Sequence, residues 1–543
     1  MPPDRSSAPS KARGRTRAST SFGALDRLTA LAESEAGAWA ARARSTTTAG
    51  QERAILRLFG VHGLDRSGRP LASAVVDRWQ VADPHNRTGG VTLPFAMALL
   101  EYDLVPQQLA LDVAAGTVDL AMEAELLREP DRRAVAEVEA NRLADAAIER
   151  IDANRVVRRE ILSLLGEPVQ PWIGMTLDEP DMEGALDKMG RLVAGGVDLV
   201  RVEIPVGREL ADRLTEAGLE VPAWKPRSHV GRAEGTGDDP APTGSQRALA
   251  EIRVALDEAA AERRAYARLA TASPALGVPE GAVVAAFERI DLTEANPMVE
   301  IIADGVDPDR ALSDHAFAHR LLRRAGTLVS ISAGPLVVAP DLASGIPSDA
   351  PTRAGRALAL QALAAAFARH NGLTPDAIVL GALPAWICED SLPGTRGLAE
   401  VAVRRALFGE HPLVFEEPDL RPDRAPLWLS VVTASLPHAG RTALVRQRAA
   451  PHPAEVARRV RAATQVAAEV ASATEPRPLT GSAHDYATAM VAAAVQTLER
   501  LTDEGWRVVA GDAGTGPGSA RAGRGAVIDR GDAFDPLAAI RQP

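Results

Sequence analysis

The chain of 543 residues contains a single cysteine, Cys388. One thiol cannot form an intramolecular disulfide, and it rules out a metal centre built from several cysteines. Lysine is also scarce, because only Lys11, Lys188 and Lys225 occur among 61 lysine and arginine residues. Aromatic residues make up 3% of the sequence, so the core must be built from alanine, valine and leucine.

Long apolar runs are missing as well. No uninterrupted run of about 18 apolar residues occurs, so no membrane-spanning helix is expected. Residues 1–20 are basic and lack the apolar segment of a secretory signal, which predicts a disordered tail. The formal charge of −11 argues against a nucleic-acid-binding surface. Together these absences favour a soluble, cytoplasmic protein that binds neither nucleic acid nor a membrane.

The first part of the chain has a helical pattern. An apolar cluster at 55–59 follows the polar, cap-like stretch 45–48. Between residues 135 and 162, apolar side chains recur near helical spacing among many charges, which is typical of a long amphipathic helix. We therefore predict an all-helical N-terminal region over residues 21–165.

From residue 166 onward, short β-rich runs alternate with alanine-rich segments of helical pattern. This alternation predicts a parallel sheet, because parallel strands need crossover connections. Seven strands are predicted, at 172–177, 197–204, 265–271, 285–292, 327–332, 377–383 and 427–432, and a candidate eighth at 441–445. Eight strands would close a (β/α)8 barrel, whereas seven would leave an open, doubly wound sheet. We favour a TIM-type barrel over residues 166–505, followed by a flexible, glycine-rich C-terminal tail over 506–543.

Two histidines lie four residues apart in the segment Asp314-His315-Ala-Phe-Ala-His319. This spacing can ligate a metal on one helix face, as in metalloproteases, where a glutamate directly follows the first histidine. Here Ala316 occupies that position and no third ligand is evident. We therefore favour a structural role for both histidines and predict no metal site.

Cofactor motifs are weak in this chain. Asp83-Pro-His85 is followed by Gly89, one residue too late for the Asp-x-His-x-x-Gly motif of base-off cobalamin binding. A Schiff-base lysine for pyridoxal phosphate needs a low-dielectric pocket and a phosphate cradle. Lys188 is expected in an outer helix, which leaves Lys225 as the one conceivable candidate. It precedes a long loop, 226–244, that is expected to lie over the barrel mouth.

Several short blocks fall in the order and spacing of a known family. They are Glu52 to Asp65, Pro70-Leu71, Val75-Val76-Asp77, Asn154-Arg155 at a closing turn, Gly196-x-Asp198, Tyr266-x-Arg268-Leu269, Pro279-Glu280, Glu288-Arg289-x-Asp291 and a tail from Gly525 to Asp535-Pro536. With these blocks the chain resembles the α subunit of the lysine 5,6-aminomutases, as a divergent member.

The resemblance implies a division of labour between two subunits. In that family the α subunit forms the barrel and surrounds the pyridoxal ring and a small amino-acid substrate. A smaller β subunit brings the cobalamin domain and the Schiff-base lysine. The implied reaction is a radical 1,2-shift of an amino group in D-lysine or L-β-lysine, started by homolysis of a cobalt–carbon bond. Pyridoxal phosphate and adenosylcobalamin are thus both expected mainly through a partner subunit.

This chain departs from the family at six aligned active-site positions. The family's arginine and serine after the second strand align with Ile204 and Glu209, and the serine at the pyridine nitrogen aligns with Pro274. The stacking tyrosine aligns with Val299, the following arginine with Asp304, and the aspartate after the fifth strand with Gly334. The local replacements that we identify as candidate cofactor-binding residues are Ser273, Arg201 and Arg208.

Two alternatives to an aminomutase subunit remain open. Loss of the orienting groups favours a catalytically impaired paralogue that acts as a scaffold or regulatory partner. A barrel enzyme of unrelated chemistry would instead use polar residues at the strand ends for acid–base work, although such residues also form ordinary solvated rims. These residues are Asp178, Glu203, Glu294, Asn296, Ser332, Thr433 and His438.

Overall fold

The computed structural model describes most of the chain. The described residues are 24–67, 69–82, 90–177, 182–202, 242–272, 277–302, 306–332, 349–381, 393–409, 411–416, 442–447, 453–473, 479–506, 527–529, 535 and 537. The predicted tail at 1–20, the candidate lysine Lys225 and the loop at 226–244, apart from its last three residues, lie outside them.

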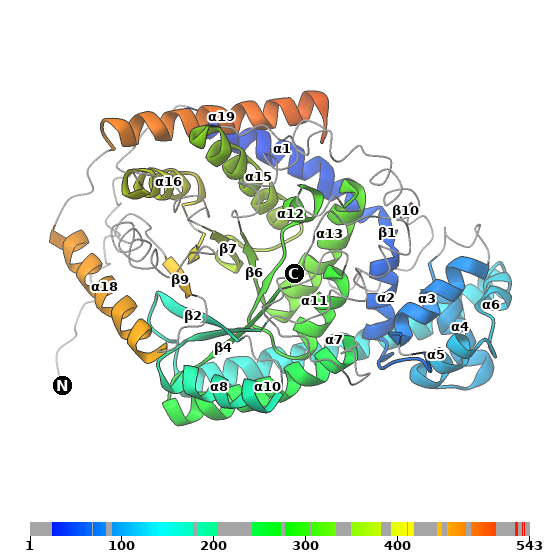
Figure 1. Cartoon of the computed structure of the whole chain (residues 1–543). Helices are drawn as coiled ribbons and strands as arrows, with labels where there is room; N and C mark the ends of the chain where they lie inside the picture. Colours follow the sequence, from blue (N-terminus) through cyan, green and yellow to red (C-terminus); the bar gives the residue numbers. More distant parts are fainter. Residues whose placement is uncertain are drawn as a thin grey trace, which may run out of the picture.

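Eight parallel strands form a closed barrel, as predicted (Figure 1). They are β2 (Trp172–Leu177), β3 (Leu199–Val202), β4 (Arg268–Ala272), β5 (Leu292–Glu294), β6 (Leu328–Ile331), β7 (Ile378–Gly381), β8 (Leu413–Glu416) and β9 (Thr442–Gln447). Each strand pairs with the next, and β9 pairs with β2 to close the ring. The open doubly wound sheet is thereby excluded.

The strands differ from the prediction in two places. Residues 285–287 belong to a helix, α11 (Val278–Phe287), and β5 begins only at Leu292. The end of α11 is apolar and buried throughout, and such a run does not distinguish a buried helix from a buried strand. Strand β8 was not predicted, whereas the run predicted at 427–432 lies outside the described residues. The candidate strand at 441–445 is β9.

Helices surround the barrel in the order that a (β/α)8 fold requires. They are α8 (Met182–Ala194), α10 (Pro242–Arg263), α11, the short α12 (Pro297–Ile302), α13 (Pro308–Ala325), α15 (Ala350–His370), α16 (Pro393–Phe408) and α18 (Pro453–Ala473). Two further helices, α1 (Leu25–Arg44) and α19 (Ser482–Glu504), pack outside α15 and add a layer on that side (Figure 1). Helix α1 therefore belongs to the barrel in space, although it lies within the region predicted as a separate N-terminal unit.

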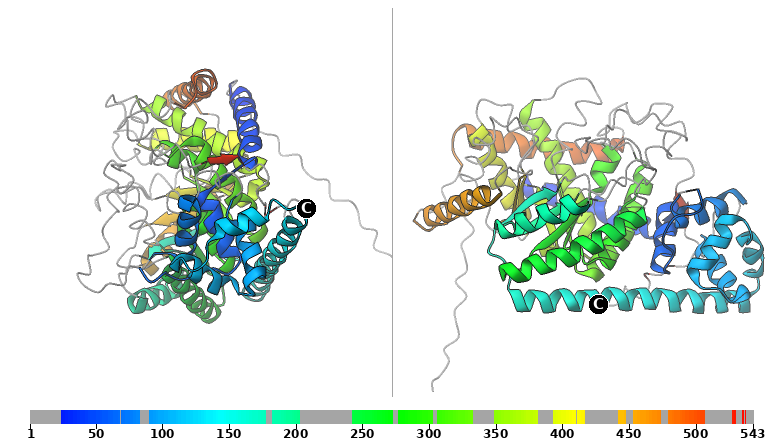
Figure 2. Two further views of the ribbon diagram at one scale, coloured as in Figure 1. Left: turned by 90° about the vertical axis from the view of Figure 1, so that its right-hand side faces the viewer. Right: turned by 60° about the horizontal axis from the view of Figure 1, so that its bottom comes forward.

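The rest of the N-terminal region forms a helical block beside the barrel. It contains α2 (Ala49–Leu58), α3 (Leu71–Ala82), α4 (Thr92–Tyr102), α5 (Pro106–Ala115) and α6 (Leu120–Leu126). Helix α7 (Pro130–Leu165) extends over 36 residues and runs along both the block and the barrel (Figure 2). The predicted closing turn at Asn154 is wrong, because this residue lies inside α7 and donates to the carbonyl oxygen of Phe287 at 2.7 Å.

A small two-stranded sheet corrects the all-helical prediction. Strand β1 (Thr46–Thr48) pairs antiparallel with β10 (Val527–Asp529) near the other end of the chain. Threonine favours extended backbone, but the partner strand is too distant in sequence for a local pattern to reveal the pairing. Thr48 also caps α2 by accepting a hydrogen bond from the Gln51 amide, as the cap-like stretch predicted.

The described part of the C-terminal tail is held against the rest of the protein. Besides β10, Asp535 forms an ion pair with Arg320 of α13 at 3.1 Å, and Leu537 is buried in the core. The flexibility predicted for residues 506–543 therefore does not extend to these positions. None of the helices in the described ranges is long and apolar enough to cross a membrane.

Candidate active site at the barrel mouth

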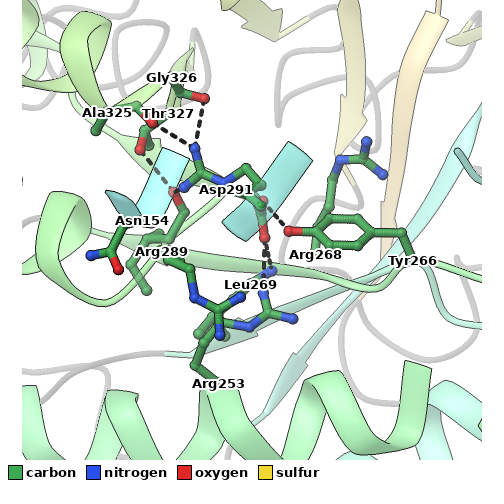
Figure 3. Close-up of polar contacts among 12 residues, drawn as sticks. Asn154, Arg253, Tyr266, Arg268, Leu269, Arg289, Asp291, Ala325, Gly326 and Thr327 are labelled. Carbon is green, nitrogen blue, oxygen red and sulfur yellow. Dashed lines mark hydrogen bonds and ion pairs between the residues drawn. The ribbon is translucent and has the colours of Figure 1, made fainter. Parts of the chain in front are cut away.

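At the N-terminal end of the barrel, a buried network around Asp291, just before β5, joins the strands to the helices around them (Figure 3). The Asp291 carboxylate accepts from the Tyr266 hydroxyl at 2.7 Å, from Arg253 Nη1 at 3.0 Å and from the Leu269 amide at 2.9 Å. Arg158 Nε lies 3.2 Å from the same carboxylate. Desolvation by burial, reinforced by the charge of Asp291, raises the pKa of Tyr266, so the phenol stays protonated and donates.

A second buried carboxylate, Asp198, lies at the same end, just before β3. Asp198 accepts from the Ile173 amide at 2.9 Å and forms ion pairs with Arg263 and Arg461. In the (β/α)8 fold this face contributes stability, whereas active sites are built at the opposite face. Several blocks that resemble the aminomutase family therefore lie at the N-terminal end of the barrel, away from the mouth.

Inside the barrel, an apolar layer lies on the N-terminal side of the mouth. The layer consists of Trp172, Leu199, Ala270, Leu292, Leu328, Val379 and Val414. Side chains two residues apart on a strand project to the same side. Arg201, Glu294 and Ser330 therefore follow the layer residues of their strands on the interior side, nearer the carboxyl ends.

Arg201 and Glu294 form a two-pronged ion pair across this upper level. Arg201 Nε lies 2.9 Å from Glu294 Oε1, and Arg201 Nη2 lies 3.1 Å from Glu294 Oε2. The two residues come from β3 and β5, and the intervening β4 contributes the small side chains of Ala270 and Ala272, which leave room for the contact. Their side chains are only 13% and 18% exposed, so the pair is largely shielded from water.

Two other residues predicted at the mouth act as structural links. Asn296 accepts from the Met298 amide at 3.0 Å, which starts α12, and its side-chain nitrogen donates to the Ser332 carbonyl at 2.9 Å. These bonds tie the end of β5 to the end of β6. A further link comes from Gln361 of α15, which donates to the carbonyl oxygens that end β6 and β7.

Most of the other residues predicted for the site lie outside the described residues. They are Asp178, Glu203, Ile204, Arg208, Glu209, Ser273, Pro274, Asp304, Gly334, Thr433 and His438. Val299, the one described position among the six family replacements, lies in α12 and packs against the hydrophobic core. The sequence predicted a cofactor contact for Arg201 and a place at the barrel mouth for Glu294. It did not predict the ion pair between them.

The described residues at the mouth do not fit a pyridoxal phosphate site. Val299 has no aromatic face to stack on the ring, and the carboxylate of Glu294 would repel a phosphate bound at Arg201. Lys188 lies in α8, on the outside of the barrel. No catalytic step through this cofactor follows from these residues. A cofactor contact by Arg201 stays a prediction.

The two histidines of α13 pack as core side chains. His315 and His319 are fully buried, their ring centres lie 5.7 Å apart, and the His319 ring lies 5.9 Å from Phe367. Burial, together with the neighbouring His315 ring, holds the pKa of His319 well below its ordinary value, so this ring is neutral. Among the described residues, no group of three or more histidine, cysteine or acidic side chains is arranged to hold a metal ion.

The fold and the mouth define the class of protein. The chain is a TIM-barrel protein whose shielded charge pair lies at the carboxyl ends of the strands. Residues 22–420 match the family model described as the D-lysine 5,6-aminomutase TIM-barrel domain of the alpha subunit. The chain therefore belongs to this family, which confirms the resemblance found in the sequence. The match does not include the block near Gly525.

Two curated relatives are similar at low identity. The lysine 5,6-aminomutase alpha subunit of Fusobacterium nucleatum is 26% identical over 382 residues, which cover 69% of this chain and 66% of the relative. The lysine 5,6-aminomutase alpha subunit of Acetoanaerobium sticklandii is 24% identical over 375 residues, which cover 68% of this chain and 66% of the relative. The matched part thus spans just under two thirds of each relative.

Similarity to solved structures is weaker. A dihydropteroate synthase from Anaplasma phagocytophilum aligns with a TM-score of 0.34 at 10% identity, covering 56% of this chain and 100% of that structure. A similarity of this size carries no argument about this chain.

Proposed function

We propose that this chain is the barrel subunit of a heteromeric, lysine 5,6-aminomutase-type enzyme that acts on a small amino acid. The observation that carries the proposal is the family match over residues 22–420, which includes both the N-terminal block and the barrel up to β8. A barrel enzyme of unrelated chemistry would have no evident use for the block. The proposed reaction is the 1,2-shift of an amino group in D-lysine or L-β-lysine.

The proposal assigns the cofactors to a partner. Pyridoxal phosphate and adenosylcobalamin would be carried mainly by a cobalamin-binding β-type subunit, which would also supply the Schiff-base lysine. Two features of this chain support that assignment. Lys188 lies on an outer helix, and the described residues of the mouth offer no fitting cofactor site. From the composition of the chain, we also propose that the protein is located in the cytoplasm.

Co-expression with a cobalamin-binding subunit tests the proposal. We expect both chains to elute together in size exclusion, with cobalamin and pyridoxal absorbance across the same peak, and D-lysine or L-β-lysine to be turned over. An unrelated cobalamin-binding protein serves as the control and should elute separately. Separate, colourless elution of this chain from its supposed partner would contradict the proposal. Assembly with both chromophores but without turnover would instead favour the impaired, scaffolding paralogue.

A further inference from the structure

A buried polar cluster lies between α16 and α19, two helices that pack against each other outside the barrel strands (Figure 1). Glu400 and Arg404 of α16 are fully buried, and Tyr486 of α19 is 8% exposed. The Tyr486 hydroxyl donates to Glu400 Oε1 at 3.1 Å, so a hydrogen bond crosses the contact between the helices. A change in the charge of Glu400 would therefore act directly on this contact.

The guanidinium of Arg404 is the unusual member of the cluster. None of its three nitrogens has a hydrogen-bond partner among the described residues, and the same holds for Glu400 Oε2. A buried charge without a partner is strongly unfavourable. Residues four apart on a helix are neighbours, so these two side chains can pair by rotation alone, without movement of the backbone. An ionised Glu400 is thus a counter-ion within reach of Arg404.

Burial disfavours that ionised form. Desolvation raises the pKa of Glu400 to about 7, although Arg404, the Tyr486 hydroxyl and Arg396 act to lower it. These three are the charged and hydrogen-bonding groups that reach Glu400 from the described parts of α16 and α19, and α1, which also touches α16, adds none. Burial and the neighbouring Glu400 raise the pKa of Tyr486, so its phenol remains a donor.

We infer that Glu400, Tyr486 and Arg404 form a proton-operated switch in the contact between α16 and α19. With a proton on Glu400, the helices are joined by its hydrogen bond with Tyr486, and Arg404 has no counter-charge. Release of the proton to solvent leaves a carboxylate that pairs with Arg404. This pairing limits the cost of the buried negative charge but does not cancel it, so the contact weakens. The switch is independent of the proposed function.

The direction of the pH dependence follows from the raised pKa of Glu400. The folded chain holds this proton more tightly than the unfolded chain, whose glutamate has the ordinary pKa of 4.5. The stabilising contribution is therefore complete below about pH 4.5 and is lost as the pH rises through about 7.

Infrared titration of the full chain, purified with any subunit that accompanies it, detects the proton itself. The C=O stretch of a protonated carboxyl group disappears on ionisation, so we expect a band that titrates near pH 7 and is missing in Glu400→Gln. Arg404→Met removes the opposing charge, and the same band should then titrate about one pH unit higher or more. Because Arg404 has no partner below pH 7, this variant should keep its melting temperature at pH 6.

Hydrogen exchange of residues 393–408 and 482–504 measures the contact. The amide of Glu400→Gln still accepts from Tyr486 but does not titrate. The exchange rate of the unsubstituted chain relative to this variant should rise about tenfold from pH 6 to pH 8. Glu455→Gln is the matched control, because Glu455 and Arg459 of α18 have the same order and spacing but are exposed. It should alter neither the band nor the exchange.

Three results would each overturn the switch. They are a carboxyl band near pH 7 that persists in Glu400→Gln, a transition that Arg404→Met leaves in place, and an exchange ratio that is constant between pH 6 and pH 8. If Arg404→Met did not fold, the first and third measurements would still decide.

Discussion

At the scale of single residues, Asp291 shows how one carboxylate can organise the end of a barrel. It accepts hydrogen bonds from the phenol of Tyr266 and from a backbone amide, and it lies against the guanidinium groups of Arg253 and Arg158. Those arginines reach it from helices outside the strands, so Asp291 connects β4, β5, α7 and α10. Arg158 and Arg253 are both buried, so the negative charge of Asp291 offsets part of the cost of burying their positive charges.

Substitution of Asp291 by asparagine should therefore destabilise the protein strongly. The amide keeps the volume but removes the carboxylate charge that faces Arg158 and Arg253, although Arg253 keeps its ion pair with Asp257. Removal of one partner of a buried pair costs about 3–5 kcal/mol. Urea denaturation followed by circular dichroism measures the loss. The control is Asp187→Asn, which removes an exposed pair with Arg191 and should cost no more than about 1 kcal/mol. Equal losses in the two variants would contradict this view of the network.

The candidate site was predictable in part from single residues. Glu294 was expected at the mouth because it follows an apolar strand. Arg201 was expected near a cofactor as a local replacement for the active-site residues that the resembling family has and this chain lacks. Their pairing was not predictable, since it depends on which strand lies between them and on the small size of Ala270 and Ala272. Asn296 was expected at the mouth too, but its two hydrogen bonds connect strand ends.

At the scale of elements, the alanine-rich α15 has a face that accepts two other helices. Almost every residue from Ala354 to Ala368 is buried, because α1 and α19 pack on the side away from the strands. At Gly355 the approach is closest, since a Cβ there would lie 2.5 Å from the Met490 carbonyl oxygen and 2.7 Å from the Ala493 Cβ. Small side chains thus make this additional layer possible.

Gly355→Ala should consequently destabilise the protein although alanine is the better helix former. The added methyl group meets backbone atoms of α19, which cannot move aside cheaply, and overpacking of this kind costs about 1–3 kcal/mol. Gly190→Ala in α8 is the matched control, because nothing lies within 4 Å of its Cβ position, and it should stabilise by about 0.5–1 kcal/mol. Thermal unfolding measures both. Stabilisation by both substitutions would show that α19 does not lie against α15 as described.

Elements with a clear local pattern were predicted well, and those without one were not. β2 has the bounds that its sequence indicated, and the long α7 was visible from its amphipathic spacing. β5 was displaced because the buried end of α11 has the same apolar composition as a strand. β1 was missed because three threonines become a strand only when β10 lies beside them.

At the scale of the whole molecule, buried polar contacts join the N-terminal block to the barrel. Glu280 of α11 accepts from Arg53 and Arg57 of α2. Burial acts to raise the pKa of Glu280, but the two arginines outweigh it and lower the pKa, so this carboxylate stays charged. Across the same junction, Thr48 donates a hydrogen bond to Asp314 of α13. The stability of this contact between the N-terminal block and the barrel therefore depends on charged side chains and should change with pH.

Asp314 should make the stability of this junction fall as the pH rises. Burial raises the pKa of Asp314 to about 6 from an ordinary value of 3.8, although Arg310 and the Thr48 hydroxyl act against the shift. The folded chain thus holds this proton more tightly than the unfolded chain. The favourable contribution is complete below about pH 4 and is lost as the pH rises through about 6.

The variant Asp314→Asn isolates this contribution, because its amide oxygen still accepts from Thr48 and does not titrate. The stability of the unsubstituted chain relative to this variant should decrease between pH 4 and 6 and stay level above 7, as measured by urea denaturation at each pH. Asp145→Asn, at an exposed position of α7, should show no such trend. A constant difference between the unsubstituted chain and Asp314→Asn across this range would refute the assignment.

The pairing of β1 with β10 imposes an order on biosynthesis. Thr46–Thr48 leaves the ribosome long before Val527–Asp529 has been polymerised, and at about 5–20 residues per second the interval is roughly half a minute to a minute and a half. The barrel likewise waits for β9 before β2 gains its second neighbour. During translation the helical block can collapse, but its threonine strand lacks a partner, and a nascent chain stalled or truncated before residue 527 cannot supply one. Completion of the polypeptide is thus a condition for the last hydrogen-bonded ladder of the fold.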